Sequence, residues 1–159
     1  MTGAQAGRVY PVAGGGTEAV SQCNSYGGGQ ASVTVDQAAI DNAGAAGAWG
    51  RLRSVPSDGT FISNTADGRV YRVVGGAPLY VSTWDVFGGG QPTTALDPYE
   101  FANYRHLRSV PSDMFLIGSP TGRVFRIAGG HPLYVASWDP YRGPQAGFTV
   151  GDWARDDVD

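Results

Sequence analysis

Short runs of β-branched and aromatic residues, separated by glycine pairs, dominate the hydrophobic pattern. Residues 70–74 read Val-Tyr-Arg-Val-Val and residues 79–84 read Leu-Tyr-Val-Ser-Thr-Trp, with Gly-Gly-Ala-Pro between them. β-branched and aromatic residues favour strands, whereas glycine tolerates positive φ and proline fixes the exit of a turn. The pattern therefore predicts a β-hairpin over residues 70–84.

The hairpin pattern occurs three times. Residues 68–85 recur 54 residues later as residues 122–139, with the same Gly-Gly-x-Pro-Leu-Tyr-Val-x-x-Trp-Asp sequence. A less similar first copy begins at Gly7 and has Glu18, Ala19 and Cys23 where the other copies have Leu, Tyr and Trp. Any ligand site made by the repeat is therefore expected to be weak or missing in the first copy.

A second shared block precedes the second and third hairpins. Leu-Arg-Ser-Val-Pro-Ser-Asp occupies residues 52–58 and again residues 107–113, and short apolar runs around Phe61 and Phe115 predict one more strand after each block. The first copy has no such block ahead of it, so we interpret it as truncated.

A short helix is predicted after each hairpin. Asp97 supplies an N-cap carboxylate, Pro98 the first helical position and Glu100 the acid three residues after the cap. Asp36 opens an alanine-rich segment in the same way, and Asp152 gives a weaker signal of the same kind. Each unit is thus a strand, a hairpin, a loop and a short helix.

The three units are expected to form a single repeat domain over residues 1–159. The first, truncated repeat spans about 7–50, the second about 51–105 and the third about 106–159. One such unit cannot bury its own apolar face, so the units must pack on each other. We expect a β-rich α+β fold with the repeats in a closed or propeller-like pseudo-threefold arrangement, and Leu79 and Leu133 buried in equivalent places. A β-trefoil, which has four strands and no helix per unit, is the alternative.

Composition excludes several classes of function. The 25 glycines, the 16% charged residues and the net charge of −3 suit a turn-rich β protein, and the absence of a basic block argues against a nucleic-acid partner. The sequence contains no apolar run of 18 residues, so no membrane span is expected. The single cysteine excludes an internal disulfide and a Cys-based zinc cluster. The N-terminal residues lack signal-peptide features, so an export signal is expected outside this chain.

No catalytic motif stands out, and no enzyme or cofactor is predicted. The two histidines, His106 and His131, are not accompanied by a Gly-x-Ser-x-Gly motif, and His131 fills a turn position. Most aspartates sit at helix starts or turns, where their carboxylates cap backbone N–H groups. The acidic tail lacks EF-hand spacing, so no metal is predicted.

Aromatic residues at fixed positions of the units are the candidate ligand contacts. Flat rings beside carboxylates suit the C–H faces and hydroxyls of sugars, but large aromatics also form cores, so both interpretations of Trp84 and Trp138 stay open. Strand alternation places Trp84 on the same face as Tyr80. Two arginines are expected to be exposed, where they can pair with aspartate or bind an anionic polymer. The candidate residues are Tyr80, Trp84, Asp85, Tyr134, Trp138, Asp139, Tyr141, Arg72 and Arg126.

The Gly-Gly-x-Pro-Leu-Tyr-Val-x-x-Trp stretches resemble the tandem repeats, of about 54 residues, found in secreted actinobacterial cell-envelope proteins. Residues 35–43 and 55–61 are also similar to those arrays, so the resemblance covers nearly the whole chain. The order of Pro-Ser-Asp at 111–113, hairpin, aromatic strand and helix is distantly similar to LGFP cell-wall-binding repeats, although the Leu-Gly-Phe-Pro signature is absent. Both resemblances imply a secreted, non-catalytic module that binds a bacterial cell-envelope glycan or polysaccharide.

The alternative function is a structural or protein-interaction module, such as an adhesin segment, a spacer or an assembly subunit. Because no strand-forming block precedes the first hairpin, the strand at residues 9–12 is expected to lack a neighbour that the corresponding later strands possess. An unpaired strand edge invites another strand. A protein partner, or self-association through this N-terminal edge, is therefore the alternative partner prediction.

Overall fold

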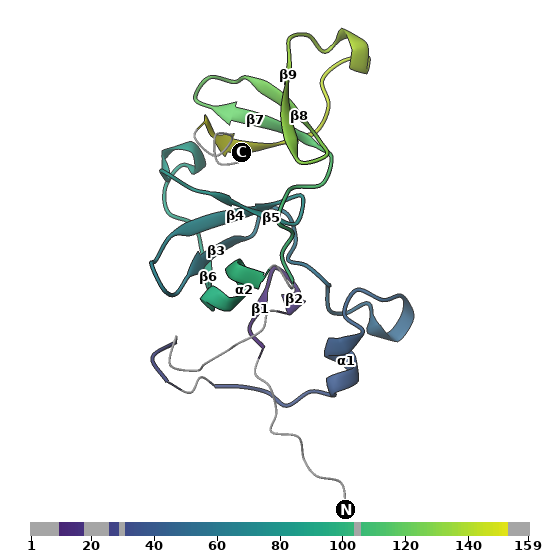
Figure 1. Ribbon diagram of the computed structural model, residues 1–159, viewed down its shortest axis with the longest axis vertical. Coiled ribbons are helices and arrows are strands. Elements are labelled where there is room, and N and C mark those ends of the chain that lie inside the picture. The colour runs from purple at the N-terminus through teal and green to yellow at the C-terminus, as the bar shows by residue number, and fades with distance from the viewer. Residues whose placement is uncertain (1–9, 18–25, 29–30, 104–105, 153–159) are drawn as a thin grey trace, which may run out of the picture.

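The fold is β-rich with a few short helices, the α+β class that the sequence predicts (Figure 1). The computed structural model describes residues 10–17, 26–28, 31–103 and 106–152. Its strands are β1 (Val12–Ala13), β2 (Gly16–Thr17), β3 (Phe61–Asn64), β4 (Val70–Val74), β5 (Ala77–Tyr80), β6 (Thr93–Leu96), β7 (Phe115–Ser119), β8 (Val124–Ala128), β9 (His131–Val135) and β10 (Gly147–Gly151). Its helices are α1 (Gln37–Asp41) and α2 (Pro98–Asn103), with 3-10 turns η2 (Gly47–Trp49), η3 (Asp85–Phe87) and η4 (Asp139–Tyr141).

Two four-stranded sheets have the same topology. The order is β5-β4-β3-β6 in one sheet and β9-β8-β7-β10 in the other. In each sheet the first three strands are antiparallel, and the fourth runs parallel to the strand that follows the Pro-Ser-Asp block. The later two hairpins and their preceding strands lie where the sequence predicts them, but the returning strand of the second hairpin covers Ala77–Tyr80 and does not extend to Trp84. Residues 93–96 and 147–151, for which the sequence pattern predicts no strand, form β6 and β10.

Local capping signals place both described helices correctly. The Asp36 carboxylate accepts a hydrogen bond from the Ala38 N–H at 2.9 Å, and the Asp97 carboxylate accepts one from the Tyr99 N–H at 2.9 Å. These bonds satisfy N–H groups that have no partner within the helix. The helix predicted after Asp152 lies outside the described residues.

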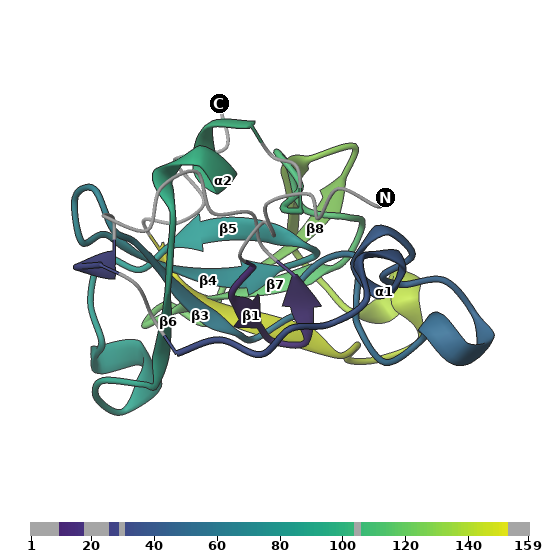
Figure 2. The same ribbon diagram turned by 90° about the horizontal axis from the view of Figure 1, so that it is seen from below.

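The sheets stack, and the described residues form no closed barrel or propeller, so neither the closed arrangement nor the trefoil alternative describes them. The sheet of β3–β6 lies between two layers, with hairpin β1–β2 and α2 on one side and the sheet of β7–β10 on the other (Figure 1). Seen from below, β1 and β2 lie in front of the β3–β6 sheet (Figure 2). Each sheet therefore has one face directed toward the preceding hairpin.

The hydrophobic core is divided between the two junctions of this stack. At both junctions the end of one hairpin covers three strands of the sheet that follows it in the chain: β3, β4 and β6 at the first junction, and β7, β8 and β10 at the second. At the first junction Ala13 packs with Ile62, Val73, Leu96 and Leu107. At the second junction Val74 and Leu79 pack with Leu116, Ile127 and Val150.

The same two backbone hydrogen bonds hold each junction. The carbonyl groups of the two turn glycines point out of the hairpin and accept N–H groups from the Leu-Arg-Ser-Val-Pro-Ser-Asp block of the next unit. At the first junction Arg53 donates to Gly15 at 2.8 Å and Ser57 to Gly14 at 3.0 Å; at the second, Arg108 donates to Gly76 at 2.8 Å and Ser112 to Gly75 at 3.0 Å.

The expectation that Leu79 and Leu133 are equally buried is wrong. The two leucines occupy the same position in β5 and β9, yet Leu79 is 7% exposed and Leu133 is 54% exposed. Leu79 is covered by Leu116, Ile127 and Val150 of the following sheet. No described residues form a further sheet over Leu133, so its burial depends on the stacking neighbour rather than on its own hairpin.

The first hairpin has fewer strand partners than the later ones. Among the described residues β1 pairs with β2 alone, whereas β4 and β8 each have a strand on both sides. Val12 on β1 is 54% exposed. The described part of this edge is therefore unpaired, as the sequence predicts. Residues 1–9 lie outside the described residues. Covering of the edge by a partner stays a prediction.

A matched pair of glycine substitutions tests how tightly the junction packs. Gly75 and Gly129 occupy the same turn position with φ of +59° in both. A Cβ at Gly75 would lie 2.6 Å from the Ser112 nitrogen, whereas a Cβ at Gly129 would meet nothing within 4 Å. Gly129→Ala should therefore show only the cost of the left-handed backbone, about 1–2 kcal/mol. Gly75→Ala should cost about 1–3 kcal/mol more through steric overlap.

Chemical denaturation of the two variants measures this difference directly. Equal losses of unfolding free energy in Gly75→Ala and Gly129→Ala would contradict the close approach of the turn to the Ser112 backbone.

Candidate ligand-binding site

A cluster of three aromatic rings lies beside the first strand of each sheet. The Phe61 ring centroid is 5.3 Å from Trp84 and 5.0 Å from Phe87, and the last two rings are 6.3 Å apart. In the second sheet the Phe115–Trp138, Phe115–Tyr141 and Trp138–Tyr141 centroid distances are 5.1, 5.0 and 6.1 Å. Both tryptophans are half-buried. Each therefore packs against the cluster while the residue stays partly exposed, and contact with a ligand stays a prediction.

A tight turn fixes the Trp84 backbone and presents the Asp85 carboxylate beside it. The Thr83 hydroxyl accepts the Asp85 N–H at 3.2 Å, and the Trp84 carbonyl accepts the Gly89 N–H at 3.1 Å. The Gln91 side-chain amide closes the turn by donating to the Gly89 carbonyl at 3.1 Å. Because these bonds are local, the turn keeps its shape without a partner molecule.

The third unit forms the same turn, with serine in place of threonine and the glutamine retained. Ser137 replaces threonine as acceptor of the Asp139 N–H at 3.0 Å, and the Gln145 amide donates to the carbonyls of Tyr141 and Gly143 at 2.9 and 3.0 Å. No role was predicted for these glutamines from the sequence. A glutamine nevertheless occurs at the equivalent position of every copy, and this recurrence is the sequence signal for their structural role.

Tyr80 and Trp84 do not share a face, contrary to the strand-alternation prediction. Strand β5 ends at Tyr80, and the chain then turns, so the two-residue period does not reach Trp84. The Tyr80 ring packs against Tyr71 at 5.8 Å, on the face opposite to Phe61. Burial raises the pKa of the Tyr71 hydroxyl above its usual range. The Tyr71 ring also packs on Phe101 of α2 at 5.0 Å, so Tyr80 belongs to the helix-facing side of the sheet.

Arg72 is a structural residue, and the expectation that it is exposed is wrong. Its guanidinium carbon lies 5.2 Å from the Phe87 ring centroid and 5.4 Å from that of Phe148, a residue of the next sheet. The Nη1 group donates a hydrogen bond to the carbonyl of Thr149 on the same strand, β10. Burial lowers the pKa of Arg72 below its usual range. The arginine thus joins one aromatic cluster to the following unit.

Arg126, the counterpart of Arg72, has a more open environment. Its guanidinium carbon lies 5.0 Å from the Phe115 ring centroid, and Nη2 is 4.0 Å from the Asp113 carboxylate. The side chain is 36% exposed. The aspartate pairing that the sequence suggested is therefore found at this arginine.

The structure brings together part of each predicted residue set. Trp138, Tyr141 and Arg126 gather around Phe115, and Asp139, which follows Trp138 in the chain, is exposed. Tyr134 is 63% exposed but packs with Phe125 at 5.8 Å, away from this group. In the preceding unit Trp84 and Arg72 gather in the same way, with Asp85 next to Trp84 in the chain, and Tyr80 is excluded. The corresponding positions of the first copy, Glu18, Ala19 and Cys23, lie outside the described residues.

The two tryptophan-bearing turns project from opposite sides of the stack. In Figure 1 the teal turn of η3 lies at the left of the molecule and the yellow-green turn of η4 at the upper right, and Figure 2 also separates them. The two sites therefore do not form one continuous surface.

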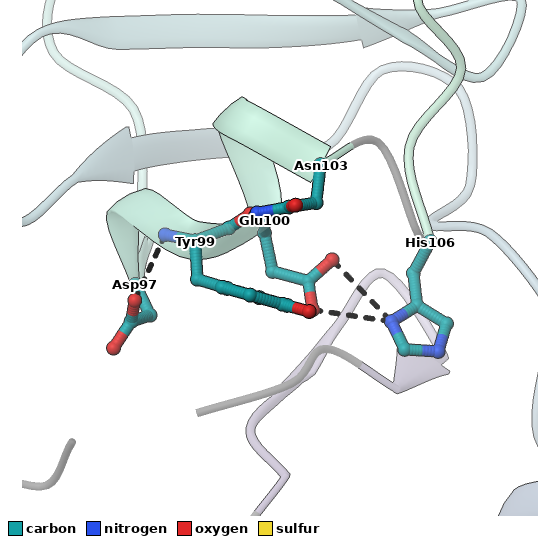
Figure 3. Close-up of polar contacts among 5 residues, drawn as sticks. All are labelled: Asp97, Tyr99, Glu100, Asn103 and His106. Carbon is teal, nitrogen blue, oxygen red and sulfur yellow. Dashed lines mark hydrogen bonds and ion pairs between the residues drawn. The ribbon is translucent and has the colours of Figure 1, made fainter. Parts of the chain in front are cut away.

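A buried carboxylate contacts a histidine next to α2. Glu100 is 0% exposed, and its two carboxylate oxygens lie 3.2 and 3.3 Å from Nδ1 of His106 (Figure 3). Asp97 caps the start of the same helix, and the Asn103 amide donates to the Tyr99 carbonyl near its end at 2.9 Å. The last two bonds stabilise the ends of α2, and the contact between Glu100 and His106 links the helix to the chain that enters the block at residues 107–113.

A hollow of about 360 Å³ lies where the two Pro-Ser-Asp blocks approach each other. Its walls include Arg53, Asp58, Gly76 and Arg108. None of the predicted ligand residues lines it, so it is a feature of the junction rather than of the aromatic clusters.

No family model, curated protein or solved structure matches the chain. Among the residues that the structure describes, no helix is long and apolar enough to cross a membrane. The same part of the chain holds no group of three or more His, Cys, Asp or Glu side chains that is arranged to bind a metal ion.

The two turns differ at one backbone position, which offers a test of their geometry. Arg142 has a left-handed φ of +61°, and Gly88 fills the equivalent place with φ of +72°. Left-handed backbone costs a non-glycine residue about 1–2 kcal/mol. Arg142→Gly should therefore raise the unfolding free energy by about 0.5–1 kcal/mol, after the entropy of the more flexible unfolded chain is subtracted.

The reverse substitution, Gly88→Arg, is the control and should destabilise the protein. Thermal unfolding of both variants measures the effect, and a loss of stability in Arg142→Gly would contradict the assignment of strain to this residue.

Proposed function

We propose that the chain is a non-catalytic binding module, made of three repeats, that attaches a secreted protein to a cell-envelope polysaccharide through its tryptophan-bearing turns. The observation that supports it is a repeated one. Trp84 beside Asp85 and Trp138 beside Asp139 occupy matching, locally fixed turns, and each tryptophan is half-exposed with an exposed carboxylate next to it.

The chemistry of these turns suits a sugar. A ring held by packing on one side gives the C–H face of a pyranose a rigid apolar surface, at little cost in side-chain entropy. The neighbouring carboxylate accepts hydrogen bonds from hydroxyl groups, and a charged acceptor strengthens such bonds. In the third unit Tyr141 and Arg126 add a second ring edge and a cation, which suits a glycan that carries negative charge.

The placement of the turns determines how avidity arises. A single short oligosaccharide cannot contact both turns, because they lie on opposite sides of the stack. A polysaccharide mesh contains many polymer chains, so a protein that lies between two of them can bind one chain at each turn. Two weak sites then give an apparent affinity well above that of either one.

Retention on purified cell-wall polysaccharide tests the proposal. Trp84→Leu and Trp138→Leu should each reduce retention, and the double variant should lose about tenfold to a hundredfold in apparent affinity. The unchanged protein should bind a soluble short oligosaccharide of the same glycan only weakly.

Tyr134→Leu is the matched control, since Tyr134 is an exposed aromatic residue outside the clusters. It should retain full binding, and circular dichroism should show that all four variants are folded. No retention of the unchanged chain, or an equal loss in the Tyr134 variant, would refute the aromatic-site proposal.

A structural or protein-interaction role is the second candidate, and the stacking itself favours it. Two hairpin ends contact the following unit within this chain through equivalent backbone hydrogen bonds, with Ala13 in the apolar contact at one junction and Val74 and Leu79 at the other. A saturable protein partner together with absent polysaccharide retention would select this candidate over the first.

A further inference from the structure

The end of the third hairpin has the features of a binding surface without a described partner. Leu133 is 54% exposed and Gly129 is exposed at the tip of the turn. No N–H group of the described residues donates to the carbonyl of Gly129 or Gly130. An exposed aliphatic side chain therefore lies beside two turn carbonyls that accept no N–H group of the described residues, of which that of Gly129 belongs to an exposed residue and that of Gly130 to a buried one beside Val110.

The second hairpin shows what such a surface contacts. Its turn carbonyls accept N–H groups from Arg108 and Ser112, and Leu79 is buried against the sheet that follows. The first hairpin makes the same two hydrogen bonds with residues 53 and 57. One mode of recognition is thus used twice within the chain.

The third turn has the geometry that this recognition requires. The φ angles of its glycines are +59° and +86°, against +59° and +79° for Gly75 and Gly76. The preceding block contacts both turns, but at different glycines: Asp58 accepts the Gly76 N–H at 3.0 Å, whereas Asp113 accepts the N–H of Gly129, the counterpart of Gly75, at 3.1 Å. The glycines of the third turn therefore already have the φ angles of their docked counterparts, while Val110 approaches Gly130 where Arg108 approaches Gly76.

We propose that the end of the third hairpin is a docking site for a further repeat of this same type. The incoming repeat would present a Leu-Arg-Ser-Val-Pro-Ser-Asp segment to the carbonyls of Gly129 and Gly130. It would cover Leu133 with aliphatic residues at the positions that Leu116, Ile127 and Val150 hold in the third unit.

A second intact copy of the chain is not the partner. Its segment at residues 52–58 already donates to the first hairpin, and its segment at residues 107–113 donates to the second. Its two sheets are likewise covered, by Ala13 in one case and by Val74 with Leu79 in the other. The partner must therefore be a repeat whose segment and sheet face are both unoccupied.

This inference does not depend on the polysaccharide proposal. The docking site consists of Gly129, Gly130 and Leu133, whereas the proposed glycan sites consist of the tryptophan-bearing turns. Loss of glycan binding and loss of docking are consequently separate results.

A lengthened chain tests the docking site. A second copy of residues 99–152 is joined directly after Asp152, which gives the added block the same spacing from Val150 that residues 107–113 have from Leu96. Backbone hydrogen exchange over residues 129–135 should slow about tenfold or more when the added repeat docks. The midpoint of thermal unfolding, Tm, should rise by about 5 °C or more.

Leu133→Asp, introduced into both chains, separates docking from simple lengthening. In the original chain the substitution is at an exposed position and should change Tm by no more than about 2 °C. In the lengthened chain it places a carboxylate in the new junction and should lower Tm by about 5 °C or more.

Three results would overturn the proposal. They are an added repeat that stays unfolded by hydrogen exchange, unchanged exchange over residues 129–135, and an equal effect of Leu133→Asp in the two chains. Light scattering of the original chain should show a monomer, and a dimer that Leu133→Asp abolishes would assign the surface to a second copy instead.

Discussion

Two glycine carbonyl groups at the turn of each of the first two described hairpins accept N–H groups from outside their own sheet, and the stack depends on how these groups are satisfied. A buried carbonyl without a hydrogen-bond donor is costly, so a turn can enter the core only where another segment supplies N–H groups. The Arg-Ser-Val-Pro-Ser segments do this at Gly14 with Gly15 and at Gly75 with Gly76. Apolar packing then follows from this arrangement, because the same contact brings the hairpin end onto the next sheet.

The parts of the fold that depend on local chemistry could be predicted from the sequence. The hairpin turns follow from their glycine pairs, and the helix starts follow from Asp36 and Asp97. Strands β6 and β10 were missed, because their parallel pairing with β3 and β7 is non-local and residues 93–96 carry little strand signal. The different burial of Leu79 and Leu133 has the same origin: identical local sequence, but a different neighbour in space.

The sequence identified residues of the candidate site, but it did not predict which of them lie together in the fold. The repeat identified Trp84 and Trp138, yet the end of β5 at Tyr80 breaks the alternation that would have placed tyrosine and tryptophan together. The two equivalent arginines show that position in a repeat does not fix a role. Arg72 is enclosed by β10 of the next unit, whereas Arg126 has no such strand among the described residues and pairs with Asp113.

The direction of the junctions also has a consequence for synthesis on the ribosome. A ribosome releases the chain from its N-terminus, and the first two hairpins are each completed by residues that lie after them in the sequence. The turn at Gly75 and Gly76 therefore emerges before its donors at Arg108 and Ser112. The first and second units thus stay incomplete until the following unit has been made, so their folding follows translation with a delay of about one repeat.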